Sequence, residues 1–211
     1  MIKYPNGHYY KPETDQLTQH LKQKHHNQAV FGQRGMALED EINASNVYYR
    51  QTQQAVVYKK PTPIQIVKVD YPKRAQAIIK EAYFRQPSTT DYNGVYRGYY
   101  LDFEAKETKN KQSFPLKNFH QHQIDHFKRC LTQQGICFVI TKFVTPKRIF
   151  LYPATKLIQY WQQSQQGPKS IPLTEFETNG FEIQYSIQPI LPYLTAVDQL
   201  ITTSKENHRE C

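Results

Sequence analysis

Two carboxylates and an amine stand at a spacing that could build a metal site. Glu104 lies thirteen positions after Asp91, and Lys106 follows two positions later, within the run Leu-Asp-Phe-Glu-Ala-Lys. Carboxylate oxygens are ligands that Mg²⁺ prefers, and a bound cation can activate a water molecule and neutralise phosphoryl oxygens. A neighbouring ammonium can stabilise the charge that builds up on a phosphate. The three residues therefore form a candidate site for hydrolysing a phosphodiester bond.

A strand predicted over residues 99–106 would place the charged side chains together. Because side chains alternate between the two faces of a strand, Asp102, Glu104 and Lys106 share one face and apolar residues take the other. A Glu-x-Lys triplet is also common as an ion pair on a surface strand, and that alternative stays open. The additional carboxylate of Asp91 favours the metal site.

A helix predicted over residues 35–46 contributes a third carboxylate. On a helical wheel Glu39 falls inside the apolar arc, whereas Asp40 and Glu41 lie at its flanks. A carboxylate that points toward a core costs several kcal/mol unless a cation meets it. Glu39 is therefore predicted to complete the acidic cluster, the alternative being a different orientation of the helix.

Four further polar residues allow either a functional or an ordinary structural role. Gln123 falls on the inner face of a helix predicted over 118–134, where it could be either a metal ligand or a hydrogen-bonded core amide. Thr89 lies two residues before Asp91, as a ligand or as a turn hydroxyl. His122 and His126 have the i, i+4 spacing of a zinc pair. We interpret them as part of a solvated face.

Composition points to a polyanionic partner. The 211 residues include 27 Lys and Arg against 18 Asp and Glu, a formal net charge of +9. Nucleic acid is the expected partner, and a membrane surface is the weaker alternative. The chain begins without a signal-peptide pattern and contains no apolar run near the roughly 20 residues that span a bilayer. The three cysteines, at positions 130, 137 and 211, are expected to be reduced thiols in the cytoplasm.

A basic stretch between two predicted strands suits contact with DNA. Strands are predicted over 55–60 and 64–69, and residues 72–86 could form either a helix or the return strand of a hairpin. Aromatic residues stand between the cations of this region, a pattern that favours phosphate contacts and base stacking over a plain solvated surface. The candidate DNA contacts are Lys59, Lys73, Arg74, Lys80 and Arg85.

The remaining pattern predicts one α/β domain with two flexible ends. Residues 1–34 are predicted to form a flexible basic arm, residues 35–201 the folded domain, and residues 202–211 a flexible tail. Strands are predicted over 136–143, 148–152 and 181–187, and helices over 155–163 and 192–201. Helices interleaved with strands indicate a mixed α/β fold.

Longer runs of sequence resemble a known family. They are Thr-Thr-Asp-Tyr-Asn-Gly, Leu-Asp-Phe-Glu-Ala-Lys-Glu-Thr-Lys, Ser-Phe-Pro-Leu, Val-Asp-Tyr-Pro-Lys-Arg and Ile-Lys-Glu-Ala-Tyr-Phe-Arg. Together they resemble the RecU family of Holliday junction resolvases, within the PD-(D/E)xK nuclease superfamily, over roughly residues 32–200. Thr90 precedes Asp91 where the superfamily is named for a proline, a common departure.

The resemblance implies a restriction-endonuclease-like mixed sheet flanked by helices, with a protruding basic stalk over about 61–86. It implies a homodimer that nicks a four-way DNA junction symmetrically in recombination and repair, in the cytoplasm at the nucleoid, with recombination proteins as further partners. It also implies Mg²⁺ or Mn²⁺ held by Thr89, Asp91, Glu104 and Gln123. Lys106 would stabilise the transition state, and Glu39 would be the helical glutamate of the superfamily.

Two alternatives remain open from the sequence. One is a nuclease on the same fold that cuts duplex DNA. The other is a DNA-binding protein that modulates recombination without relying on cleavage. The presence of Asp91, Glu104 and Lys106 together argues against the second.

Overall fold

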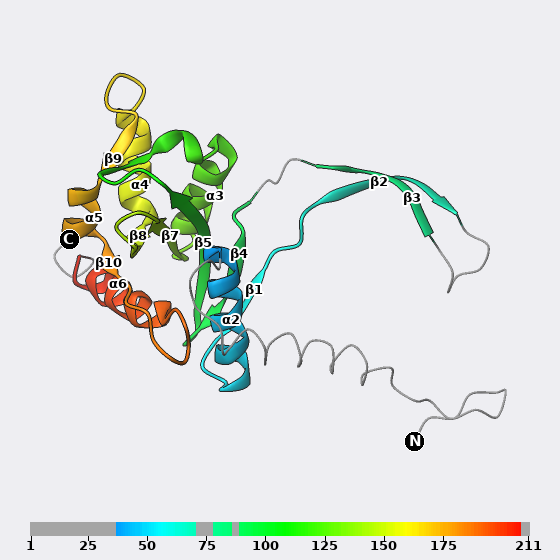
Figure 1. The fold of residues 1–211 in the computed structure, drawn as a ribbon, viewed down its shortest axis with the longest axis horizontal. Helices are drawn as coiled ribbons and strands as arrows, with labels where there is room; N and C mark the ends of the chain where they lie inside the picture. Colours follow the sequence, from blue (N-terminus) through cyan, green and yellow to red (C-terminus); the bar gives the residue numbers. More distant parts are fainter. Residues whose placement is uncertain (1–36, 71–77, 86–88, 208–211) are drawn as a thin grey trace. The chain divides into compact units, whose positions relative to one another are not determined.

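A six-stranded mixed sheet forms the centre of the fold. The computed structural model describes residues 37–70, 78–85 and 89–207 (Figure 1). The strand order is β1-β4-β5-β7-β8-β10, and every neighbouring pair is antiparallel except β5 and β7. The strands are β1 (Val56–Lys59), β4 (Tyr92–Tyr96), β5 (Tyr99–Thr108), β7 (Ile136–Phe143), β8 (Arg148–Pro153) and β10 (Phe181–Glu182).

Helices cover both faces of this sheet. On one face, α2 (Leu38–Gln51) and α6 (Tyr193–Asn207) pack against apolar side chains of β5, β7 and β8. On the other face, α3 (Gln121–Thr132), α4 (Ala154–Gln163) and α5 (Leu173–Asn179) close a second apolar cluster. The mixed α/β sheet flanked by helices, predicted from the sequence, is confirmed.

Strand β5 alternates as predicted. Asp102 and Glu104 are buried on the face covered by α3, and Phe103 points into the opposite cluster. The Phe103 ring stacks on Tyr92 at 4.8 Å and on Phe138 at 4.7 Å. Because these rings come from β4, β5 and β7, the stack fixes the three strands around the carboxylates.

The basic stretch forms a hairpin apart from the main sheet. Strands β2 (Ile64–Asp70) and β3 (Ile78–Phe84) pair antiparallel with each other and with no other described strand (Figure 1). The stretch 72–86, ambiguous in sequence, thus contains a return strand among its described residues, Ile78–Phe84. Apolar side chains on both strands are exposed, including Phe84 at 83%. Lys73 and Arg74 lie outside the described residues.

Several predicted boundaries were wrong. Helix α2 runs from Leu38 to Gln51, past the expected end at residue 46. The helix predicted over 118–134 is two elements, a 3₁₀ turn η2 (Leu116–Asn118) and then α3. Two extended residues, Phe119 and His120, separate them, and α3 ends before Gln134, which has a left-handed φ of 61°. The strand predicted over 181–187 pairs with β8 at only two positions.

The last helix is longer than predicted, and strand β4, helix α5 and two short strands were missed. Helix α6 continues to Asn207, so the tail predicted from 202 is helical up to that residue. Strands β6 (Ser113–Pro115) and β9 (Ser170–Pro172) form a small antiparallel pair beside the second cluster. The predicted arm, 1–34, lies outside the described residues. Among the described helices, none has the length and apolar character needed to cross a membrane.

Candidate functional site

The structure brings Asp91, Glu104 and Lys106 together. Asp91 directly precedes β4, and the pairing of Tyr92 with Phe103 places it opposite Glu104 of β5. The Asp91 backbone N–H donates to Oε2 of Glu104 at 3.1 Å, and the Lys106 Nζ lies 2.6 Å from Oε1 of the same carboxylate. Two strands thus converge their acidic side chains at one place, with an ammonium alongside.

Glu104 is buried with more negative charge than its surroundings balance. Its side chain is 0% exposed. Oε1 is met by the Lys106 ammonium and has no other donor among the described residues. Burial first, and then the neighbouring Asp91, raise the pKa of Glu104 to about 8, although Lys106 opposes them. A cation placed at these oxygens would relieve the imbalance.

Tyr92 lies next to the same group of carboxylates. Its hydroxyl donates to the backbone oxygen of Glu39 at 3.4 Å. Burial raises the pKa of Tyr92, and the negative charges of Glu39, Asp91, Asp40 and Glu104 raise it further. The start of α2, the residue before β4 and the middle of β5 therefore share one acidic region.

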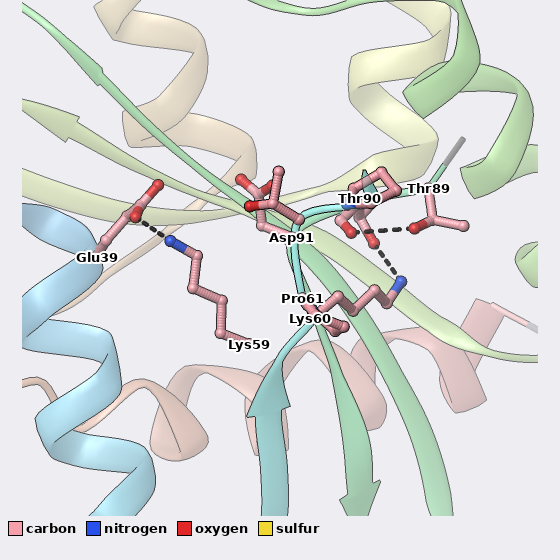
Figure 2. A pocket seen from close by; sticks show the side chains of 9 residues that line it. Glu39, Lys59, Lys60, Pro61, Thr89, Thr90 and Asp91 are labelled. Atoms are coloured by element: carbon pink, nitrogen blue, oxygen red, sulfur yellow. Dashed lines mark hydrogen bonds and ion pairs between the residues drawn. The ribbon is translucent and has the colours of Figure 1, made fainter. Parts of the chain in front are cut away.

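Glu39 lies at the edge of this region. It borders a pocket of about 300 Å³ with Asp91, and Figure 2 shows Lys59 reaching toward the Glu39 carboxylate, with which it forms an ion pair. The other lining residues are Lys60, Pro61, Thr62, Pro63, Thr89 and Thr90. The Glu39 side chain is 45% exposed, so its predicted position inside the core was wrong.

The core-facing carboxylate of α2 is Glu41. It is buried, and its Oε1 accepts from Lys142 Nζ at 2.7 Å and from the Tyr185 hydroxyl at 3.0 Å. The wheel failed because part of the buried stripe of α2 is polar. Its members are Leu38, Glu41, Ile42, Ser45, Asn46 and Tyr49.

Thr89 and Gln123 stand in different relations to the carboxylates. Thr89 lines the same pocket as Asp91, and its hydroxyl donates to the Thr90 backbone oxygen at 3.3 Å. Gln123 is buried in the first turn of α3, where its Oε1 accepts from the His120 N–H at 3.0 Å. Within the described residues, no hydrogen bond joins Gln123 to Asp91 or Glu104. Their roles as ligands stay predictions.

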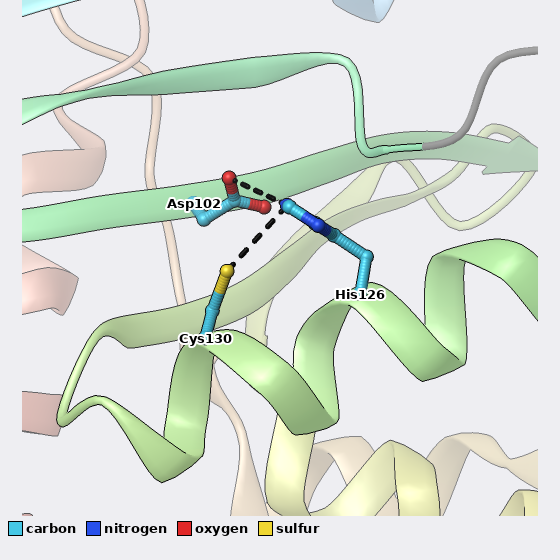
Figure 3. Close-up of side chains that lie close together, drawn as sticks. All are labelled: Asp102, His126 and Cys130. Carbon is cyan, nitrogen blue, oxygen red and sulfur yellow. Dashed lines mark hydrogen bonds and ion pairs between the residues drawn. The ribbon is translucent and has the colours of Figure 1, made fainter.

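His126 does not belong to a solvated face. Its side chain is mostly buried, and Nε2 lies 3.0 Å from Oδ2 of Asp102 and 3.5 Å from Sγ of Cys130 (Figure 3). Sequence reasoning therefore missed Asp102 as well, a buried carboxylate on the same strand face as Glu104. Its alternation with Glu104 was the available signal. Cys130 and Cys137 are free thiols, as predicted, and Cys211 lies outside the described residues.

Three of the predicted DNA contacts lie within the described residues. Lys59 is paired with Glu39, Lys80 lies 2.7 Å from Asp70 across the hairpin, and Arg85 donates to Gln65 at 3.2 Å. All three cations are exposed or partly exposed, so they remain accessible to a polyanion.

Comparisons with known proteins agree with the predicted resemblance. A family model described as Recombination protein U matches residues 33–199. The Holliday junction resolvase RecU of Lacticaseibacillus casei (strain BL23) is 61% identical over 209 residues, 99% of each chain. That of Latilactobacillus sakei subsp. sakei (strain 23K) is 62% identical over 201 residues, 94% of this chain and 95% of the relative.

A solved structure gives a weaker likeness. Hjc, a Holliday junction resolvase from Archaeoglobus fulgidus, is 10% identical with a TM-score of 0.36, over 72% of this chain and 93% of that one. This score is too low to establish the fold, which rests on the strand order given above. The family match spans most of the chain, and the relatives match it almost end to end. The chain therefore belongs to the RecU family.

Proposed function

We propose that this protein is an endonuclease that resolves four-way DNA junctions by cutting two strands symmetrically, in recombination and repair. The observation that carries the proposal is the contact of Asp91 with Glu104 beside the Lys106 ammonium. Two relatives of 61% and 62% identity bear the name Holliday junction resolvase, which supports a four-way junction as the substrate.

A divalent cation fits the residues that the site presents. Glu104 offers a buried carboxylate whose Oε1 meets only the Lys106 ammonium among the described residues, and hard oxygen ligands of this kind suit Mg²⁺, with Mn²⁺ as a substitute. Asp91 and Glu104 would hold it, with the Thr89 hydroxyl and the second lone pair of the Gln123 carbonyl as further ligands. When bound, the cation supplies an activated water and neutralises phosphoryl oxygens.

The protein's own residues position the phosphate and stabilise its charge. Lys106 forms an ion pair with Glu104, which keeps the Lys106 ammonium beside the carboxylates. There the ammonium can stabilise the charge that develops on a phosphate during cleavage. Glu39 and Asp91 line the same pocket. The Glu39 carboxylate can accept a hydrogen bond from a water molecule in that pocket. Lys59 pairs with Glu39 and limits repulsion between that carboxylate and the substrate.

Charge and symmetry suit a branched DNA held by a dimer. Each chain has a formal net charge of +9, and a junction concentrates phosphates where its four arms meet. A homodimer presents two equal sites related by a two-fold axis, which matches the near-two-fold symmetry of a junction. The hairpin of β2 and β3 adds exposed cations and aromatic rings to this surface.

One assay tests the proposal directly. Purified protein is mixed with a synthetic mobile four-way junction or with a linear duplex of the same sequence, with Mg²⁺ added or withheld. We expect paired, symmetric nicks in the junction only when Mg²⁺ is present. Equal cutting of the linear duplex would indicate a duplex nuclease instead. Junction binding without cutting would indicate a protein that modulates recombination.

The hairpin gives a second prediction, on affinity. Lys68 and Lys80 are exposed on β2 and β3, so Lys68→Gln and Lys80→Gln should each weaken junction binding several-fold. Each change should also lower the salt slope, the steepness of log binding constant against log salt concentration, by about one. Asp70→Asn should have the opposite effect, because Asp70 pairs with Lys80 at 2.7 Å and competes with phosphate for its ammonium. Binding titrations at several salt concentrations, without Mg²⁺, measure both.

The matched control removes the same charge elsewhere. Lys147 is exposed in the turn between β7 and β8, and Lys147→Gln is expected to leave the slope near that of the native protein. If the hairpin variants and Lys147→Gln behave alike, the DNA does not contact this hairpin.

A further inference from the structure

We propose that Lys60, Thr90 and Asp102 form a buried clasp that fixes Asp91 in the site and joins it to both ends of the β2–β3 hairpin. The three are positioning residues, since none of them is assigned to the phosphate or the metal. The proposal rests on the proposed function for its effect on cutting, but its effect on cation binding can be measured without DNA.

The clasp is a closed set of hydrogen bonds around one carboxylate. Lys60 Nζ donates to Oδ2 of Asp102 at 2.9 Å and to the Thr90 hydroxyl at 2.9 Å. The Thr90 hydroxyl in turn donates to Oδ1 of Asp102. Thr90 is 3% exposed, and the Asp102 side chain is 0% exposed. Both oxygens of the carboxylate are thus engaged by residues from two other segments.

Those two segments are the ends of the hairpin insertion. Lys60 directly follows β1 and leads into β2, whereas Thr90 follows β3 and leads into β4. Asp102 lies on β5, where it pairs with Asn93 of β4 on one side and Cys137 of β7 on the other. The clasp therefore fastens both ends of the hairpin to the interior of the six-stranded sheet.

Two further hydrogen bonds beside the clasp hold the backbone of Asp91. Its carbonyl oxygen accepts from the Lys60 N–H at 2.7 Å, and its N–H donates to Oε2 of Glu104 at 3.1 Å. Thr90, its direct neighbour, is held by Asp102. Figure 2 shows the Lys60 amine turned toward Thr90, whereas the Asp91 side chain points to the opposite side of this segment. Asp91 thus has little freedom to move away from Glu104.

The clasp depends on each of its members. Asp102 also accepts from the Tyr100 hydroxyl at 2.9 Å, and His126 lies within hydrogen-bonding distance. Removing one donor leaves a buried charge short of a partner, which favours movement of the segment that carried the donor.

A zinc-like site at Asp102, His126 and Cys130 is the competing interpretation (Figure 3). Imidazole and thiolate are ligands that zinc favours. However, the Asp102 oxygen nearest to His126 is Oδ2, which already accepts from the Lys60 ammonium and the Tyr100 hydroxyl. A second cation there would meet the Lys60 charge at short range. The geometry therefore points to an internal clasp.

Thr90 offers a clean test, because two substitutions separate its hydroxyl from its shape. Thr90→Val keeps the volume and removes the donor, and Thr90→Ser keeps the donor. Mn²⁺ affinity is measured without DNA from the electron paramagnetic resonance of the free ion, and single-turnover cutting of the junction gives the rate and the half-saturating DNA concentration. Thr90→Val is expected to lose about 10–100-fold in Mn²⁺ affinity or in rate, the usual effect of losing a group that orients a metal ligand.

Thr90→Ser should stay within about threefold of the native protein, and half-saturating DNA should change little in either variant, which separates positioning from lost DNA contacts. If both variants match the native protein, or if both are impaired equally, the clasp is overturned. If the native protein does not cut junctions but Mn²⁺ affinity follows the expected order, the proposed function fails and the clasp stands.

A second pair keeps the test decisive if Thr90→Val does not fold. Lys60→Met should reproduce the loss of Mn²⁺ affinity, whereas the charge-matched change Lys128→Met, at an exposed position of α3, should not. Cys130→Ser distinguishes the zinc interpretation. It should leave Mn²⁺ affinity and cutting near native, and a loss as large as that of Thr90→Val would overturn the clasp.

Discussion

Asp91→Asn is expected to abolish Mg²⁺-dependent cutting while junction binding survives. The change removes a negative oxygen from the pair that faces the cation but keeps the size of the side chain. The Asp91 N–H can still donate to Glu104. Loss of metal-assisted charge stabilisation is worth several kcal/mol, so the single-turnover rate should fall at least about a thousandfold. Nicking of an end-labelled junction and a mobility shift in EDTA measure the two properties separately.

The control is a matched change at a distant carboxylate. Asp198 lies on α6, where it accepts from the Tyr96 hydroxyl at 3.1 Å and Arg97 at 3.0 Å. Asp198→Asn should leave both cutting and binding near native. If Asp91→Asn still cuts with Mg²⁺, the metal site lies elsewhere and the proposed mechanism is wrong. If it loses binding in EDTA as well, Asp91 contacts the DNA or supports the fold.

The central part of this site could be predicted because β5 follows the simplest rule of strands. Strict alternation around Phe103 places Asp102 and Glu104 on one face, and that relation does not depend on any distant contact. The approach of Asp91 was less certain from spacing alone. It follows from a tight β4–β5 hairpin, which turns at Arg97 and Gly98, both in the left-handed region. A turn of this kind fixes the register across the pair.

The wrong assignments of Glu39 and His126 arose where polar side chains are buried, because the prediction took apolar residues as the mark of the core. In α2, Ser45 accepts from the Leu191 N–H at 3.0 Å and Asn46 accepts from the Tyr193 hydroxyl at 2.5 Å. A wheel built on apolar residues cannot show that such side chains face the core, so it selected Glu39 in place of Glu41. His126 was misassigned for the same reason, since its partner Asp102 comes from another element. Long-range polar pairing is not visible in local periodicity.

Glu104→Gln is expected to remove cutting and, without metal, to stabilise the fold at alkaline pH. The buried carboxylate has a pKa raised to about 8, first by burial and then by Asp91. The neutral amide avoids this unfavourable charge, and its oxygen can still accept from the Asp91 N–H. Its amino group takes the place of Oε1, so the partly exposed Lys106 ammonium turns away toward solvent. At about 1.4 kcal/mol per pKa unit, the substitution should raise the free energy of unfolding by a few kcal/mol at alkaline pH. The midpoint temperature of thermal unfolding should then be several degrees higher.

The pH dependence gives this prediction its sign. In the unfolded chain Glu104 loses its proton near its ordinary pKa of 4.5, whereas the folded protein keeps it until about pH 8. The unfolded state therefore binds fewer protons across that interval, and the native protein loses stability as the pH rises through it. The midpoint of Glu104→Gln minus that of the native protein, measured in EDTA, should be small at pH 5 and should grow up to about pH 8.

Lys106→Met is expected to shift stability in the opposite direction, although it too should lose cutting. The Lys106 ammonium lies 2.6 Å from Glu104 and lowers the pKa of that carboxyl, so its removal deepens the alkaline loss of stability. Adding Mg²⁺ at pH 8 should raise the midpoint of the native protein and leave Glu104→Gln nearly unchanged, because ligand binding stabilises only the state that holds it. Equal responses of the two proteins to Mg²⁺ would show that Glu104 does not hold the cation. The opposed midpoints of the two inactive variants distinguish a site built around an uncompensated carboxylate from ordinary damage to the fold.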